Sequence, residues 1–275
     1  AEARAVAELL RSEGLVVLAG DSGVGKSSLA RAGVMPLVED GVLGEGRAWR
    51  AVALTPGVRP VAALLAALGH GASPADAAAL DAEAWAQGVA ERFTRHHGVV
   101  LLVDQLEELV TVAPAAEAAE AVRLLVALGG RWPGLRVLAT ARGDYLGRLS
   151  ALPRFAAPLA RALFFVSPLG RDGLREAVVG PLRATGDRFE DDGLVERLVE
   201  EAAAPGALPL LQFALAELWE RRDAERRVLT SASLEAMGGL RGALARHADA
   251  TLAALPAPER RAARALLLRL VTEEG

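Results

Sequence analysis

One short segment has the residue types and spacing of a phosphate-binding loop. Gly20-Asp21-Ser22-Gly23-Val24-Gly25-Lys26-Ser27 fits the P-loop pattern G-x-x-x-x-G-K-S/T. Glycines at these places allow backbone N–H groups to turn inward around phosphate oxygens. Lys26 would place a compact ammonium on the β- and γ-phosphates, and Ser27 would offer its hydroxyl to Mg²⁺. The segment therefore predicts a site for a nucleoside polyphosphate.

Lys26 is the only lysine in this chain of 275 residues, although the chain has 31 basic residues. The sequence also lacks isoleucine and asparagine, which indicates a GC-rich coding background in which arginine replaces lysine wherever a positive charge suffices. A retained lysine therefore indicates chemistry that a planar guanidinium does not serve.

The segment has two alternative interpretations, a structural turn and a protease nucleophile segment. A glycine-rich turn can be purely structural, but such a turn would not need the only lysine. Gly20-Asp21-Ser22-Gly23 also resembles the nucleophile segment of chymotrypsin-like proteases, which need a histidine and an aspartate for proton relay. No histidine precedes position 70, and the helical patterns that follow do not suit an all-β barrel.

A second apolar run carries acidic residues at its end. The run from Val99 to Val103 (VVLLV) is followed by Asp104, Gln105, Glu107 and Glu108. Asp104 is in the position to serve the Mg²⁺ shell. Because Gln105 follows the aspartate directly, either Glu107 or Glu108 takes the base role or hydrolysis is slow. The alternative is an ordinary buried strand capped by Asp104.

A third apolar run, from Leu135 to Thr140, ends at Arg142. An arginine at the carboxyl edge of a strand beside the phosphate site can sense the γ-phosphate. The alternative is an ordinary surface arginine, in a chain that has many.

Alternating apolar runs and helical patterns predict the fold. Strands are expected at 15–19, 49–54, 99–103, 135–140 and 163–166, and helices lie between them near 60–68, 81–95, 115–129 and 143–150. This alternation predicts an α/β fold, a three-layer sandwich with a parallel five-stranded sheet. No strand is expected after about residue 167, where amphipathic helices follow.

Composition excludes several function classes. The net charge of −4 argues against a general attraction to nucleic acid or membrane surfaces, and the absence of cysteine excludes disulfides and thiolate zinc sites. No apolar run approaches the roughly 18 residues of a membrane span. We therefore expect a soluble, cytoplasmic protein with no membrane partner and no general nucleic-acid partner. Both ends look like pieces of helices, so a fragment of a longer chain is expected.

Several stretches beyond the P-loop carry a family resemblance. They are TPGVRP, DQLEEL, TARGDYL, GALPLLQFALAELWERR and LTSASLEAMGGLRGALARHAD. With the P-loop, they resemble the STAND class of signal-transduction ATPases, an AAA-related group that includes the NLR immune receptors. The nearest likeness is to the bacterial novel STAND NTPases, which often carry WD repeats.

The resemblance implies three domains and a set of residue roles. It implies a P-loop domain over 1–167, a helical lid over 168–228 and the start of a winged-helix region over 229–275. Residues Gly20 to Ser28 would bind the phosphates of ATP or ADP, and Ser27 and Asp104 would bind Mg²⁺. Arg142 would be the γ-phosphate sensor. Pro209 would match the lid proline beside the base, although the preceding glycine, Gly206, lies three residues before it instead of two.

The implied function is a slow, Mg²⁺-dependent ATPase switch. ADP would hold a closed monomer, and exchange for ATP would permit self-association, controlled by sensor and effector modules outside this chain. Two other functions remain open: a DNA-binding regulator that uses the winged helix, and a P-loop kinase for a small molecule. The basic stretches at 221–227 and 259–261 contain interleaved acidic residues, which favours a solvated helix face over a nucleic-acid surface.

Overall fold

The computed structural model describes residues 2–44, 46–69, 81–93, 96–204 and 206–270. The chain divides into two compact units, Ala1–Pro168 and Leu169–Gly275. Among the described residues, no helix has the length and apolar character to cross a membrane.

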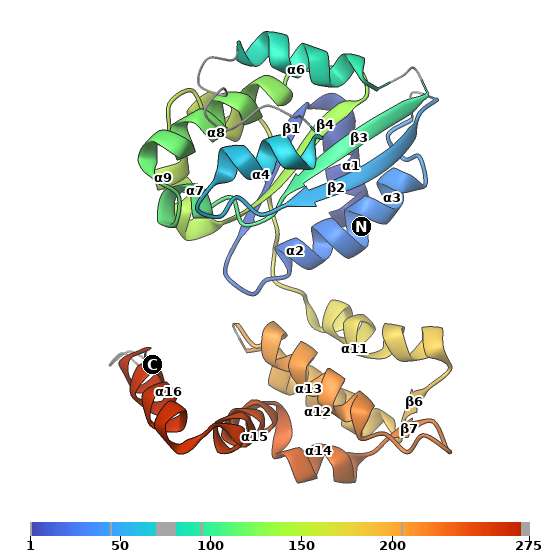
Figure 1. Ribbon diagram of the computed structural model, residues 1–275. Coiled ribbons are helices and arrows are strands. Elements are labelled where there is room, and N and C mark those ends of the chain that lie inside the picture. Colours follow the sequence, from blue (N-terminus) through green and yellow to red (C-terminus); the bar gives the residue numbers. More distant parts are fainter. Residues whose placement is uncertain (1, 45, 70–80, 94–95, 205, 271–275) are drawn as a thin grey trace. The chain divides into compact units, whose positions relative to one another are not determined.

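The first unit is built on one parallel sheet (Figure 1). Its strands are β1 (Leu15–Gly20), β2 (Ala48–Leu54), β3 (His97–Val103), β4 (Leu135–Arg142) and β5 (Leu163–Phe165), in the order β2-β3-β4-β1-β5. Every neighbouring pair is parallel. The five predicted strands and the α/β fold are therefore confirmed. The inner strands are continuous apolar runs because helices cover both of their faces.

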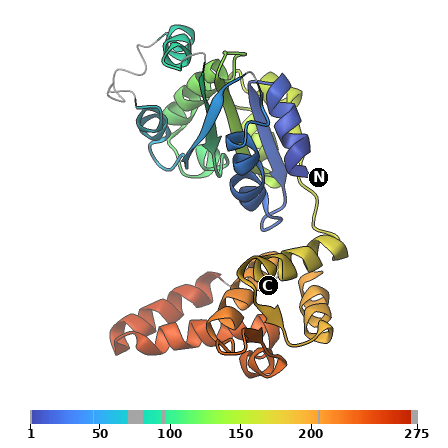
Figure 2. The same ribbon diagram turned by 90° about the vertical axis from the view of Figure 1, so that its right-hand side faces the viewer.

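Helices pack on both faces of the sheet, as Figures 1 and 2 show. Successive strand side chains point to opposite faces, so Val16 and Leu18 join one core cluster and Leu15 and Val17 the other. The helical segments of this unit are α1 (Glu2–Ser12), α2 (Lys26–Ser28), η1 (Leu29–Val34), α3 (Met35–Glu39), α4 (Pro60–Ala67), α6 (Ala82–Glu91), α7 (Glu108–Thr111), α8 (Ala115–Leu128), η2 (Gly143–Tyr145), α9 (Leu146–Ser150) and α10 (Ala156–Arg161).

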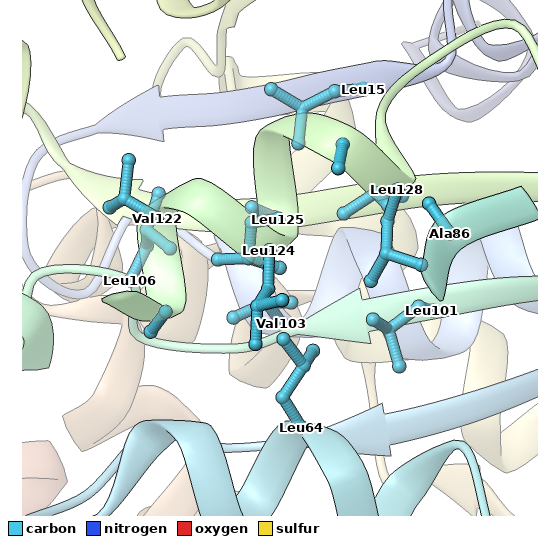
Figure 3. Close-up of a cluster of buried hydrophobic side chains, with 14 of the residues drawn as sticks. Leu15, Leu64, Ala86, Leu101, Val103, Leu106, Val122, Leu124, Leu125 and Leu128 are labelled. Atoms are coloured by element: carbon cyan, nitrogen blue, oxygen red, sulfur yellow. The ribbon is translucent and has the colours of Figure 1, made fainter. Parts of the chain in front are cut away.

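The larger core lies between the sheet and helices α4, α6 and α8. Figure 3 shows Leu101 and Val103 of β3 among leucines of α4 and α8, with Leu15 of β1 nearby. The opposite core packs the other face of the sheet against α1, η1 and α3. Two buried layers of this kind fix the sheet rigidly and therefore hold its carboxyl edge in place for a site.

The helical segment after the P-loop departs from a regular α-helix. Residues Leu29–Val34 form a π-helix, in which the Met35 N–H donates to the Ala30 carbonyl five residues earlier. Pro36 follows directly, has no N–H to donate to Ala32, and its ring would crowd that carbonyl in a regular helix. The wider turn removes this conflict just before the proline.

The second unit is mainly helical and has its own apolar core. Its elements are α11 (Arg171–Thr185), β6 (Arg188–Phe189), α12 (Asp192–Ala202), α13 (Leu208–Glu220), β7 (Val228–Leu229), α14 (Ser231–Met237), α15 (Gly239–Ala254) and α16 (Ala257–Leu270). Helices α11 to α15 contribute to this core, whereas α16 buries none of its residues.

The expectation of no strand after about residue 167 is wrong. Strands β6 and β7 form a short parallel pair. Two-residue strands leave no recognisable run in a sequence, and this pair is held by a buried charge. Asp187, whose side chain is 4% exposed, accepts a hydrogen bond of 3.1 Å from Arg227 and lies 3.6 Å from Arg222. The described part of 229–270 contains no strand after β7, so the winged-helix region stays a prediction.

Candidate nucleotide site

The P-loop connects the buried strand β1 to the short helix α2. Gly23 and Gly25 have φ values of 77° and 101°, which a residue with a side chain rarely adopts. These turns bring the chain back to the start of α2, where the first amides have no partner within the helix. Asp21, Ser22 and Ser28 are exposed along this path, and Val24 is half-buried. The predicted phosphate-binding residues therefore form one continuous loop at the carboxyl edge of the sheet.

Lys26 is buried at the start of α2, with 8% of its surface exposed. Its ammonium donates to the carbonyl oxygens of Gly20, at 3.0 Å, and of Asp21, at 2.7 Å. Burial lowers the pKa of Lys26 below its ordinary value, and the negative charge of Glu107 opposes part of that shift. A polyphosphate would supply the negative charge that this buried cation lacks.

Asp104 lies at the end of β3 and accepts hydrogen bonds from three other elements. Its Oδ1 accepts from the Ser27 hydroxyl of α2 at 2.7 Å and from the Thr140 hydroxyl of β4 at 2.6 Å. Its Oδ2 accepts from Arg31 of η1. Burial alone would raise the pKa of Asp104, but the bonds from Thr140, Ser27 and Arg31 outweigh it and hold the pKa below its usual value.

Arg31 and Thr140 were missed at the sequence level. Arg31 is one of many arginines, and its one available signal is its position four residues after Ser27, on the same face of a helix. Thr140 was placed only as the last residue of a predicted strand. Its role depends on β4 lying between β1 and β3, an order that apolar runs do not reveal.

The carboxylates of the two candidate bases, Glu107 and Glu108, accept hydrogen bonds from different parts of the sheet edge. The Glu107 carboxylate accepts the backbone N–H of Arg142 at 3.2 Å and acts electrostatically on Lys26. The Glu108 carboxylate accepts the backbone N–H of Gly57 at 2.7 Å, in the loop after β2. Of the two carboxylates, Glu107 therefore bonds to the end of β4 and acts on the charge of Lys26, whereas Glu108 bonds to the loop after β2. Gln105, between them and Asp104, is exposed and has a φ of 63°.

Arg142 ends β4 and pairs in register with Gly20, where the P-loop begins. Its guanidinium donates to Asp144 at 3.1 Å and 2.7 Å and lies over the Tyr145 ring. Its position beside the P-loop suits a γ-phosphate sensor, but in this structure its side chain is held by Asp144.

Pro209 is the second residue of α13 and belongs to the second unit. A proline fits there because the first turn of a helix needs no donor. Its predicted contact with the base of a nucleotide stays a prediction.

The residues present fit a magnesium nucleotide. A hydroxyl and a carboxylate oxygen meet at 2.7 Å between Ser27 and Asp104, and hard oxygen ligands of this kind suit Mg²⁺. A buried ammonium lies in the loop directly before Ser27. Bound Mg²⁺ would neutralise charge on the terminal phosphates.

The family follows from the whole sequence. The sequence pattern described as Novel STAND NTPase 1 matches residues 1–275. The chain belongs to this family. The family is the one that the resemblance indicated, and its description is that of an NTPase. No match is found among curated proteins.

Solved structures of low sequence identity share the fold. The Aeropyrum pernix ORC1 protein in complex with DNA has a TM-score of 0.63 at 20% identity, over 100% of this chain and 72% of that one. The Aeropyrum pernix ORC2 protein in ADPNP and ADP complexes has a TM-score of 0.58 at 14% identity, over 85% of this chain. An S. cerevisiae Hsp104–casein complex has a TM-score of 0.54 at 18% identity, over 83% of this chain and 38% of that one. This chain spans 65% of the ORC2 chain in its ADPNP and ADP complexes and 66% of the ORC2 chain in its ADP form.

Proposed function

We propose that this chain is the nucleotide switch of a signal-transduction ATPase. The observation that carries the proposal is the hydrogen bond between Ser27 and Asp104, 77 residues apart, beside the buried Lys26. It joins the P-loop serine to an acidic residue of another strand, as binding of a magnesium nucleotide requires. The preferred ligands are ATP and ADP, with Mg²⁺.

Within this site, we assign the base role to Glu107 because its carboxylate bonds to the backbone of Arg142, beside the start of the P-loop, and acts electrostatically on Lys26. Arg142 is the proposed sensor of the γ-phosphate. Its release from Asp144 would accompany ATP binding, and an ADP-bound form would keep the pair. Hydrolysis is slow, since Gln105 takes the place of a glutamate directly after Asp104.

The switch acts by a difference in affinity between two states. Changing a population from 1:99 to 99:1 needs about 5.5 kcal/mol of differential binding. Charge-assisted hydrogen bonds contribute roughly 1.5–3 kcal/mol each, so contacts of Lys26 and Arg142 with a γ-phosphate would supply much of this. In the proposed cycle, Pro209 contacts the base in the closed ADP state and the ATP state permits self-association.

Thermal unfolding of the whole chain with ADP, ATP or GTP, each with Mg²⁺, tests this proposal. A nucleotide at a hundred times its dissociation constant should stabilise the fold by about 2.7 kcal/mol. We expect adenine nucleotides to give this shift and K26A to lose it. The matched control is R11Q, which removes an exposed ion pair with Glu8 on α1 and should keep the shift. Equal shifts in wild type and K26A would contradict the site.

A further inference from the structure

The carboxylate that would serve Mg²⁺ is already paired with a cation of the chain itself. Arg31 Nε and a terminal guanidinium nitrogen lie 3.1 Å and 2.9 Å from Asp104 Oδ2. The other oxygen, Oδ1, accepts both the Ser27 and the Thr140 hydroxyls. Both oxygens of Asp104 are therefore engaged in the structure, and the side of the carboxylate that the hydroxyls leave open is covered by the guanidinium.

A metal ion and this guanidinium compete for the same carboxylate. Two positive charges that share one partly buried anion repel each other strongly, because the local dielectric is low. Asp104 cannot move aside, since its side chain is 7% exposed and tied to α2 and β4. Arg31 can, because its side chain is 53% exposed.

The helix geometry explains why this arginine reaches the site. Ser27 and Arg31 are four residues apart and so lie on the same face of the segment that follows the P-loop. Arg31 lies in the π-helix η1, a rare element that often accompanies functional sites. Both side chains consequently meet the same carboxylate, one on each oxygen.

We propose that Arg31 is a built-in counter-cation of the magnesium site, which neutralises Asp104 in the absence of metal and gives up Oδ2 when Mg²⁺ enters with a nucleotide. The inference rests on the proposed nucleotide site. Arg31 is then a positioning residue that sets how much Mg²⁺ the site requires, and nucleotide exchange includes the replacement of one cation by another.

The test compares wild type with R31Q in thermal unfolding across a series of Mg²⁺ concentrations, with and without ADP. Without metal, R31Q should melt at a lower temperature because buried Asp104 loses its partner. Mg²⁺ alone should raise the melting temperature of R31Q and leave that of wild type unchanged. With ADP, half-maximal stabilisation should need at least about tenfold less Mg²⁺ in R31Q, because the two charge-assisted hydrogen bonds from Arg31 to Asp104 no longer have to be broken.

Three further variants complete the design. R11Q removes an arginine ion pair outside the site and should respond to Mg²⁺ as wild type does. R31Q combined with D104N should lose the response to Mg²⁺ alone. R31K keeps a cation but cannot donate both hydrogen bonds of the guanidinium, so it should require an intermediate Mg²⁺ concentration. R31K also replaces R31Q in the comparison with wild type if R31Q does not fold.

Two results would overturn the inference. One is an identical Mg²⁺ requirement in wild type, R31K and R31Q. The other is a loss of ADP binding by R31Q at every Mg²⁺ concentration, which would make Arg31 a direct phosphate ligand. If wild type fails to bind any nucleotide, the proposed function fails, while the response of R31Q to Mg²⁺ alone still decides the role of Arg31.

Discussion

Asp104 joins more elements of the site than any other residue described above. Its carboxylate accepts hydrogen bonds from α2, from η1 and from β4, and it remains ionised in spite of burial because those donors favour the charged form. In the proposed function this carboxylate serves Mg²⁺, and in the present structure its hydrogen bonds contribute to stability.

This leads to a prediction about pH. The folded pKa of Asp104 lies below its unfolded value, so its contribution to stability is present above about pH 4 and is lost as the pH falls through the folded pKa. D104N should therefore be less stable than wild type at neutral pH by about 2 kcal/mol, the size expected for a hydrogen bond to a charged group.

Melting temperatures of both proteins from pH 7 down to about pH 3 check this prediction, and the difference should shrink toward the acid end. D40N, at an exposed aspartate after α3, should follow wild type throughout. A constant difference at every pH would mean that Asp104 contributes through its shape and not its charge.

The surroundings of Lys26 disfavour its charged form, whereas those of Asp104 favour the charged carboxylate. Its ammonium is buried, and within the described ranges of the chain its hydrogen-bond partners are two carbonyl oxygens, so its charged form is disfavoured. Carbonyl dipoles compensate a buried cation less than a full negative charge does. The P-loop therefore holds an unfavourable charge that a phosphate would relieve.

At the scale of elements, the loops at the carboxyl edge separate the roles of two adjacent glutamates. Glu107 turns toward β4 and the lysine, whereas Glu108 fixes the loop between β2 and α4 through Gly57. The same short segment after β3 thus carries the proposed base and also fixes the loop after β2.

We predict different consequences for E107Q and E108A. E107Q keeps an acceptor for the Arg142 N–H but removes the base, so phosphate release should fall about 100-fold while ADP still binds. E108A should lower the free energy of unfolding by about 1 kcal/mol, or the melting temperature by about 2–4 °C, and leave hydrolysis intact. Phosphate release and thermal unfolding, measured on both variants, check this; the reverse pattern would assign the base to Glu108.

Apolar runs and the P-loop pattern predicted the five strands, their parallel direction and the positions of Lys26, Ser27 and Asp104. The runs succeed best for the inner strands β1, β3 and β4, which are covered on both faces and are therefore largely apolar. They give no information about strand order, so the role of Thr140 could not be predicted. They also miss β6 and β7, whose pairing depends on a buried aspartate with two arginines that lie far from it in the sequence.

At the scale of the whole molecule, the chain has two units with separate apolar cores. We predict that ADP with Mg²⁺ raises the melting temperatures of both units, because Pro209 of the second unit is proposed to contact the nucleotide. Differential scanning calorimetry checks this by following the transitions with and without ADP. Neither transition should shift in K26A. A shift confined to the first unit would leave Pro209 without a role in binding.

The order of the strands gives a nucleotide held by this loop a direction. β4 and β3 lie on one side of β1 and carry Arg142 and Asp104, so the terminal phosphate and its metal would face that side. The sugar and base would then extend toward β5, on the other side of β1, where Phe165 ends the strand with 61% of its surface exposed. In the proposed function, discrimination between adenine and guanine would thus depend on the outer edge of the sheet, together with Pro209, and be separate from the residues that hold the phosphates.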